Sequence, residues 1–113
     1  MTLSSRIAAA PVEQTGLMLE EAWRFIHGSS HWTGKTIGPG DKFGRFLNAQ
    51  AYHDAAMMLI PDDWMITFLS ELGLAGGCVC ELGNPATSQD AKSDEGARTI
   101  PLAIAAAAVR IKE

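Results

Sequence analysis

The stretch WMITFLSELGLAGGCVCEL, residues 64–82, contains two segments with the composition of β-strands. The first, WMITFLS (64–70), combines aromatic and β-branched residues in a mostly apolar run, which predicts a strand buried on both faces. The second, CVCEL (78–82), follows LGLAGG (72–77), whose glycines favour a connection. Strands this close in sequence pair most simply as an antiparallel hairpin with a slightly long loop. We therefore predict a small antiparallel sheet.

Four further segments have the features of helices, namely apolar residues at helical spacing and recognisable caps. They are residues 3–10, 17–27, 49–60 and 100–112. The expected N-caps are Ser4 or Ser5 for the first helix, Asn48 for the third and Thr99 for the last. The last helix is apolar around most of its circumference, so we expect it to be buried against the sheet.

The remaining segments, 28–48 and 83–98, lack a sustained period. The first is rich in glycine and predicts a loop, and the second is polar and is expected to be the least ordered part of the chain. A hairpin of two strands is only marginally stable. We therefore expect either a third strand within 30–47 or strand pairing across a homodimer. The predicted fold is α+β, a single domain (1–113) in which a small antiparallel sheet packs with helices in a compact α/β sandwich.

Composition and charge argue against several classes of protein. Nine basic and thirteen acidic residues give a net charge of −4, and the basic residues are spread thinly, which argues against nucleic-acid binding. No apolar run approaches the ~20 residues of a membrane span. The N-terminal apolar run, Ile7 to Ala10, is too short for a signal peptide, so a cytoplasmic protein is expected. Two cysteines do not indicate a disulfide framework.

The segment GSSHWTGKTIG, residues 28–38, resembles a phosphate-binding loop because it contains Gly-Lys-Thr after an earlier glycine. That motif requires four residues between its two glycines, whereas five separate Gly28 from Gly34. A phosphate-binding loop also follows a buried strand and opens a helix, whereas here a predicted helix comes first. The sequence therefore does not predict a nucleotide site at this segment.

The residues that could hold a metal or carry acid-base chemistry do not form a convincing constellation. The metal candidates are His27, His31, His53, Cys78 and Cys80. The expected break of the helix at 28–30 separates the first two histidines, and the two cysteines alternate on one face of a strand, where they are expected to be small buried side chains. Asp62 and Asp63 are adjacent in a turn and Glu81 lies on the second strand, with no nucleophile beside them. We predict no catalytic residue, no metal site and no cofactor.

Aromatic and basic side chains in the glycine-rich segment form the candidate binding site. They are Trp32, Lys42, Phe43 and Phe46. Rings exposed on a loop would mark a recognition patch. The alternative is that the rings fold back and cover an edge of the small sheet.

Three motifs in the second half of the chain fit a known layout: YHDAAMMLIPDDW (52–64), GGCVCELGNP (76–85) and ARTIPLAIAAAAVRI (97–111). They resemble the phage ABA sandwich domain, a family of small, mostly uncharacterised phage and prophage proteins. In that family a helix with Asp-x-Ala ends at a Pro-acidic-x-Trp turn, and an Ala-rich helix that begins with a Thr-x-Pro-like or Thr-Pro-like start closes the fold. The matching positions are Asp54, Ala55, Ala56, Leu59, Pro61, Trp64, Thr99, Pro101 and Ala105.

The segment QTGLMLEEAWRFIHG (14–28) is similar to the family's N-terminal helix, so the resemblance spans about three-quarters of the chain. It implies an α/β sandwich and an origin in phage or prophage DNA. It implies no enzyme activity and no ligand set, so no catalytic residue is carried over. The segments 28–47 and 83–98 fit the layout less well.

Two functional hypotheses follow. The first is a phage- or prophage-derived accessory protein of the host cytoplasm, a non-enzymatic interaction or structural module that binds an unknown protein partner or a second copy of itself. The alternative is a small metal- or nucleotide-dependent enzyme or regulator that uses residues from the set His31, Lys35, His53, Cys78 and Cys80. A nucleic-acid-mimicking inhibitor would also be acidic, but a net charge of −4 is too mild to argue for it.

Overall fold

In the computed structural model of the protein, the C-terminal helix α6 (Ile100–Lys112) lies at the centre of the fold. Every residue from Pro101 to Val109 is buried. Thr99 caps the helix as predicted, because its hydroxyl oxygen accepts a hydrogen bond of 3.4 Å from the amide of Leu102. Five of the buried residues are alanines, whose small side chains allow neighbouring elements to approach the helix axis closely.

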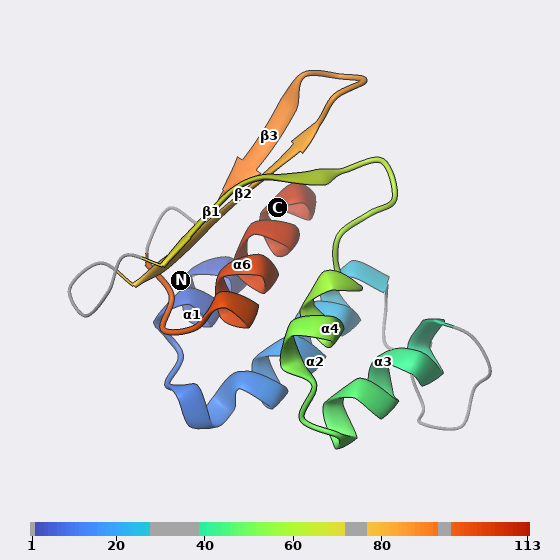
Figure 1. Ribbon diagram of the computed structural model, residues 1–113, viewed down its shortest axis with the longest axis vertical. Coiled ribbons are helices and arrows are strands. Elements are labelled where there is room, and N and C mark those ends of the chain that lie inside the picture. Colours follow the sequence, from blue (N-terminus) through green and yellow to red (C-terminus); the bar gives the residue numbers. More distant parts are fainter. Residues whose placement is uncertain (1, 28–38, 72–76, 93–95) are drawn as a thin grey trace.

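The structure describes residues 2–27, 39–71, 77–92 and 96–113. Before α6 these residues form α1 (Leu3–Ala9), the short 3-10 helix η1 (Val12–Gln14), α2 (Thr15–His27), α3 (Pro39–Asn48), α4 (Tyr52–Met57), β1 (Met65–Glu71), β2 (Cys78–Asn84) and β3 (Gln89–Lys92). Helices α1, α2 and α4 and strands β2 and β3 pack on α6, so the helices and the sheet lie on different sides of it (Figure 1). No helix among the described residues is both long and apolar enough to cross a membrane.

The three strands form one antiparallel sheet with the order β1-β2-β3, which confirms the predicted hairpin and the α+β fold. Leu69 pairs with Cys80, and Leu82 pairs with Ala91. The side chains of Cys78, Cys80 and Leu82 are buried, and they alternate along β2 as a strand packed on α6 requires. The two cysteines are therefore small buried side chains, as expected.

The third strand is β3, in the polar segment that was predicted to be the least ordered. The predicted position within 30–47 was wrong for its described part, since residues 39–47 are helical, and 30–38 lie outside the described residues. A tight turn at 85–88 joins β2 to β3. Asn84 shapes this turn, because its Oδ1 accepts a hydrogen bond of 3.0 Å from the amide of Ala86. Ser88 completes it with a φ of 59°.

Helix α3 corrects the second part of the predicted loop at 28–48, because the chain is helical from Pro39 to Asn48, whereas 28–38 lie outside the described residues. The reason is tertiary: the ring of Phe43 is fully buried and stacks on Trp23 of α2, with ring centroids 4.5 Å apart. Asn48 consequently ends α3 and does not cap the next helix, which begins after Ala51. The N-cap of the first helix was also predicted wrongly, since Thr2 accepts the hydrogen bond of the Ser5 amide.

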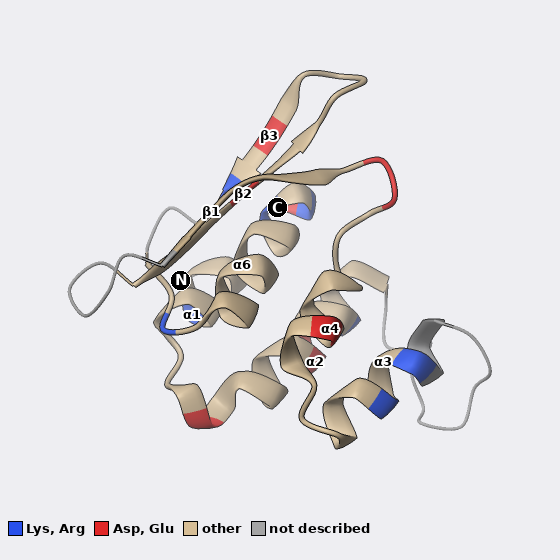
Figure 2. Cartoon of the chain, in the orientation of Figure 1, with Lys and Arg blue, Asp and Glu red and all other residues tan. Residues whose placement is uncertain are grey.

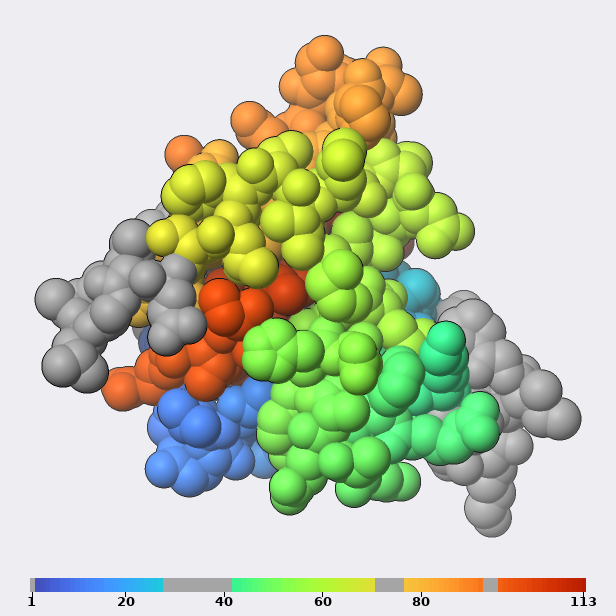
Figure 3. All heavy atoms as spheres, in the orientation of Figure 1, coloured from blue at the N-terminus to red at the C-terminus, as the bar shows by residue number. Residues whose placement is uncertain are grey.

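Strand β1 is not buried on both faces, which corrects the prediction made from its apolar run. The exposed fractions of Met65, Phe68 and Leu69 are 55%, 49% and 43%. Helix α6 packs on β2 and β3, whereas the extensive contacts of β1 are with β2 alone. The apolar run therefore extends beyond the helical layer, and its atoms lie at the molecular surface (Figure 3).

Candidate functional site

The sheet has one face turned away from α6, and its composition follows from the register. Residues that pair directly across antiparallel strands share a face. Phe68 and Lys92 both pair with Glu81, and Met65 and Asp90 both pair with Gly83. Along β2, the residues of this face alternate with the buried residues. We call the following residues the outer surface: Met65, Thr67, Phe68, Val79, Glu81, Gly83, Asp90 and Lys92.

Thr67 belongs to the outer surface because β1 contains a β-bulge. The register shifts between Ile66 and Phe68, so Thr67 is an extra residue opposite Glu81. The Thr67 hydroxyl donates a hydrogen bond of 3.2 Å to the backbone carbonyl of Glu81, which holds the bulge against β2. The bulge brings the Thr67 and Phe68 side chains together on the same part of the sheet.

Exposed apolar side chains are concentrated on β1. Among the described residues, three of the seven large apolar side chains that are exposed belong to this one strand. Met65 and Phe68 are on the outer surface, whereas Leu69 shares the face of Cys80 and is nevertheless 43% exposed. Contiguous exposed apolar groups on a folded protein are typical of interaction sites.

The free edge of β1 adds backbone groups to this surface. No described strand pairs with the side of β1 opposite β2, and the strand contains neither lysine nor proline, two residues that commonly protect sheet edges. The bulge at Thr67 is the edge-protecting device that β1 does contain. The regular part of the edge is therefore the C-terminal half of the strand.

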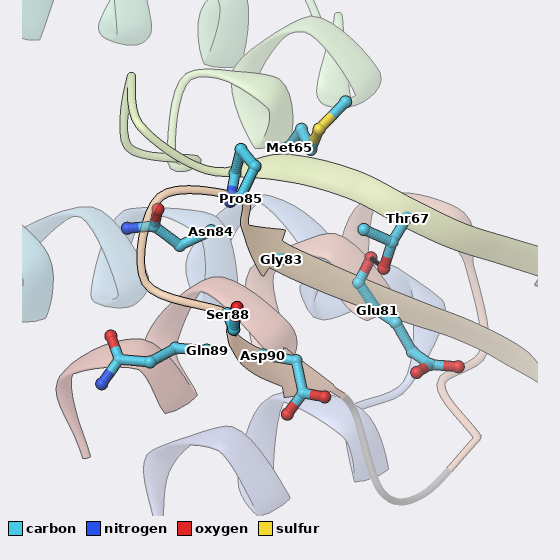
Figure 4. Close-up of a pocket in the computed structure, with 9 residues that line it drawn as sticks. All are labelled: Met65, Thr67, Glu81, Gly83, Asn84, Pro85, Ser88, Gln89 and Asp90. Carbon is cyan, nitrogen blue, oxygen red and sulfur yellow. Dashed lines mark hydrogen bonds between the residues drawn. The ribbon is translucent and has the colours of Figure 1, made fainter.

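A pocket of about 280 Å³ opens on the outer surface above Gly83 (Figure 4). A Cβ atom at Gly83 would lie 2.9 Å from Cγ2 of Thr67, so the absence of a side chain there leaves the floor of the pocket open. Met65, Thr67 and Pro85 supply apolar lining. Glu81 and Asp90 extend from neighbouring strands on the same side of the sheet. Neither carboxylate has an ion-pair partner among the described residues, where the recorded ion pairs are Arg6–Glu21 and Arg24–Glu20.

The residues predicted to bind a partner lie elsewhere. Trp32 is outside the described residues, and Lys42, Phe43 and Phe46 are on α3, on the helical side of the molecule away from the sheet (Figure 2). The Lys42 ammonium lies 5.8 Å from the centroid of the partly buried Phe46 ring. Phe43 is fully buried and covers α2, not an edge of the sheet as the alternative interpretation held. Binding through Trp32, Lys42, Phe43 and Phe46 stays a prediction.

The metal and catalytic candidates are dispersed. His27 contacts Trp23, with ring centroids 4.1 Å apart, and His53 is exposed on α4. Burial, and secondly the Glu81 carboxylate, raise the pKa of Cys80 to about 11, so its thiol stays protonated at neutral pH. Within the described residues no group of three or more potential ligands gathers around one point.

The Asp63 carboxylate has a structural role. The exposed Asp63 accepts a hydrogen bond of 3.2 Å from Nδ2 of the buried Asn84, which ties the turn before β1 to the end of β2. His31 and Lys35 lie outside the described residues. The alternative of a small metal- or nucleotide-dependent enzyme or regulator therefore stays a prediction without a described site.

Sequence reasoning missed the outer surface because it treated β1 as buried and 83–98 as a loop. A usable signal was present: Gly83 directly follows an alternating segment in which Glu81 occupies an outward position. A glycine inside a strand often marks a site where another group approaches the backbone closely.

No family model, curated protein or solved structure matches this chain.

Proposed function

We propose that the protein is a non-enzymatic interaction module that binds a protein partner through the outer surface. The observation that carries this proposal is the exposure of Met65 and Phe68 on the outer surface of an edge strand, together with the exposure of Leu69 on the opposite face of that strand. Burying such side chains against a partner contributes ~25 cal/mol for each Å² of apolar surface removed from water. The edge of β1 additionally offers backbone hydrogen bonds to an incoming strand.

The setting that we propose is the cytoplasm of a host cell, as an accessory protein of phage or prophage origin. The support for this setting is the resemblance of residues 52–64, 76–85 and 97–111 to the phage ABA sandwich domain. It rests on those short motifs alone, because no family model matches the chain.

Site-specific photo-crosslinking tests the proposed function. The photoreactive residue p-benzoylphenylalanine replaces Phe68 in one variant and Phe25 of α2 in the other, two phenylalanines with similar exposed fractions of 49% and 44%. In a bacterial host we expect a discrete crosslinked product from position 68 and none from position 25. Equal products from both positions, or none from either, would contradict the proposal.

We also propose a homodimer in which the β1 strands of two copies pair at their free edges. The three-stranded sheet does not need this pairing for its own completion, so the support is the exposed edge and its apolar side chains. Native mass spectrometry should then show a dimer. Replacing Leu69 with lysine should convert it to a monomer, because a charge on an edge strand opposes strand addition. A wild-type protein that is monomeric at all concentrations would refute the homodimer. The crosslinking experiment would then decide alone whether the protein is an interaction module.

A further inference from the structure

The pocket above Gly83 combines features that select one kind of occupant. Its lining is apolar at Met65, Thr67 and Pro85, and it carries carboxylates at Glu81 and Asp90 (Figure 4). A long side chain with an aliphatic stem and a cationic head matches both parts. Its stem contacts the apolar lining while its head approaches the carboxylates.

Resting on the proposed function, we infer that the outer surface docks a partner segment that inserts a lysine or arginine side chain into the pocket above Gly83. An apolar side chain of the same segment then covers Phe68, which is exposed and pairs across the strands with Glu81 of the pocket lining. The partner is thus a protein whose contact surface is basic and apolar, complementary to a chain of net charge −4.

The size of the pocket favours a side chain as its occupant over a larger ligand. Its volume of about 280 Å³ is at the lower end of the range for small-molecule sites, which extends to ~1,000 Å³. The carboxylates oppose phosphate, which argues against a nucleotide or a nucleic-acid backbone. Lys92 pairs with Glu81 in the register but is not among the residues that line the pocket, so the pocket itself keeps two carboxylates and no cation.

Nuclear magnetic resonance titration of the isotope-labelled full chain tests this inference with defined probes. The probes are the N-acetyl N-methylamides of arginine and lysine, the same derivative of citrulline as a neutral isostere of arginine, and spermidine as a free amine. We expect the arginine and lysine probes to shift the amide signals of Glu81, Gly83 and residues 88–90 saturably, and citrulline to leave them unchanged. Shifts of equal size with citrulline would overturn the inference.

Variants separate the charge effect from a general surface effect. The double variant Glu81→Gln/Asp90→Asn should weaken binding of the arginine probe by at least about fivefold, the scale of an exposed charge pair. Glu13→Gln, an exposed acidic residue on η1, should leave binding unchanged. An affinity that the double variant keeps, or that Glu13→Gln lowers equally, refutes the role of the pocket carboxylates.

The pocket floor provides a second, independent variant. Gly83→Ala fills the floor but places its Cβ 2.9 Å from Cγ2 of Thr67. Thr67→Ser removes that methyl and keeps the hydroxyl, so the double variant Gly83→Ala/Thr67→Ser should fold and lose the probe, while Thr67→Ser alone binds it. If the double variant still binds the arginine probe, the probe does not bind in the pocket above Gly83.

The outcomes also distinguish this inference from the proposed function. Crosslinking at position 68 without binding of any basic probe refutes the basic side chain and leaves the interaction module standing. Binding of the basic probes without crosslinking at position 68 refutes the interaction module and leaves the pocket as a site for a basic group. Tighter binding of spermidine than of the arginine and lysine probes would refute a protein side chain in favour of a free polyamine.

Discussion

Leu69 and Leu82 provide a matched test of how far the helical layer extends under the sheet. Both are leucines on the face turned toward α6, since Leu69 pairs with the buried Cys80 and Leu82 alternates with it. Leu82 is fully buried, whereas 43% of Leu69 is exposed. Replacing each leucine with alanine removes the same atoms from neighbouring strands. The difference between the two losses in the free energy of unfolding therefore reports whether α6 lies beneath Leu69 as it lies beneath Leu82.

The expected losses in the free energy of unfolding follow from burial. At ~0.8 kcal/mol for each buried carbon, the three carbons removed from Leu82 account for ~2.4 kcal/mol, and the cavity left under β2 raises the total to about 3 kcal/mol. Leu69 buries a little over half of its side chain, so its transfer contribution is about 1.4 kcal/mol as an upper limit. The site is open to solvent and leaves no enclosed cavity, so we expect a loss of about 1 kcal/mol.

Urea denaturation followed by tryptophan fluorescence or circular dichroism measures both losses. At about 4 °C per kcal/mol for a chain of this size, Tm should fall by about 12 °C for Leu82→Ala and by about 4 °C for Leu69→Ala. Unchanged denaturant slopes would show that the variants keep the same unfolding transition.

Equal losses for the two variants would refute the reasoning. They would mean that Leu69 is packed as tightly as Leu82, so that the face of β1 turned toward α6 is covered as far as Leu69. The proposed function would then lose the support of Leu69 and rest on Met65 and Phe68, which belong to the outer surface.

Three further predictions concern single side chains. The folded-state pKa of Cys80 is raised to about 11, so its neutral thiol contributes stability that is fully present below the pKa of the unfolded thiol and is lost as pH rises through the folded value. Between pH 8 and 11 the free energy of unfolding should therefore fall by about 2 kcal/mol more in the wild-type protein than in Cys80→Ala. Equal falls in the two proteins would contradict this assignment. Thr99→Ala removes the N-cap of α6 and should lower the free energy of unfolding by about 1 kcal/mol, as measured by denaturant unfolding. An unchanged denaturant midpoint would show that the cap does not stabilise the protein. Phe43→Ala should cost about 3–4 kcal/mol and Phe46→Ala clearly less, because only Phe43 is fully buried; the reverse order by thermal unfolding would contradict the packing of α3 on α2.

The elements predicted correctly are those whose signals are local. The hairpin follows from two apolar segments around a glycine-rich connection, and β2 begins where Gly77 adopts a φ of +70°. A Cβ at Gly77 would lie 2.7 Å from the carbonyl oxygen of Ala97, so the chain needs glycine there. Helix α6 follows from its alanines and its Thr99 cap. In both cases the residues that specify the element are those that form it.

The elements predicted wrongly depend on distant partners. Helix α3 contains two glycines besides its proline and has weak helix propensity, yet Phe43 finds a partner in Trp23, about twenty residues earlier in the chain. Strand β3 is polar and would not be stable alone, but Ala91 pairs with Leu82 and the strand packs on α6.

The sequence by itself determined the α+β class, the buried C-terminal helix, the antiparallel pairing of β1 with β2 and the burial of the two cysteines. Local propensity and apolar periodicity contain that information, because they act between residues that are close along the chain. The tertiary structure decided which face of the sheet is covered, where the third strand lies and that the pocket above Gly83 exists. These features depend on where α6 ends under the sheet and on which residues meet across strands. An apolar run such as 64–70 has the same composition whether a helix covers one of its faces or both.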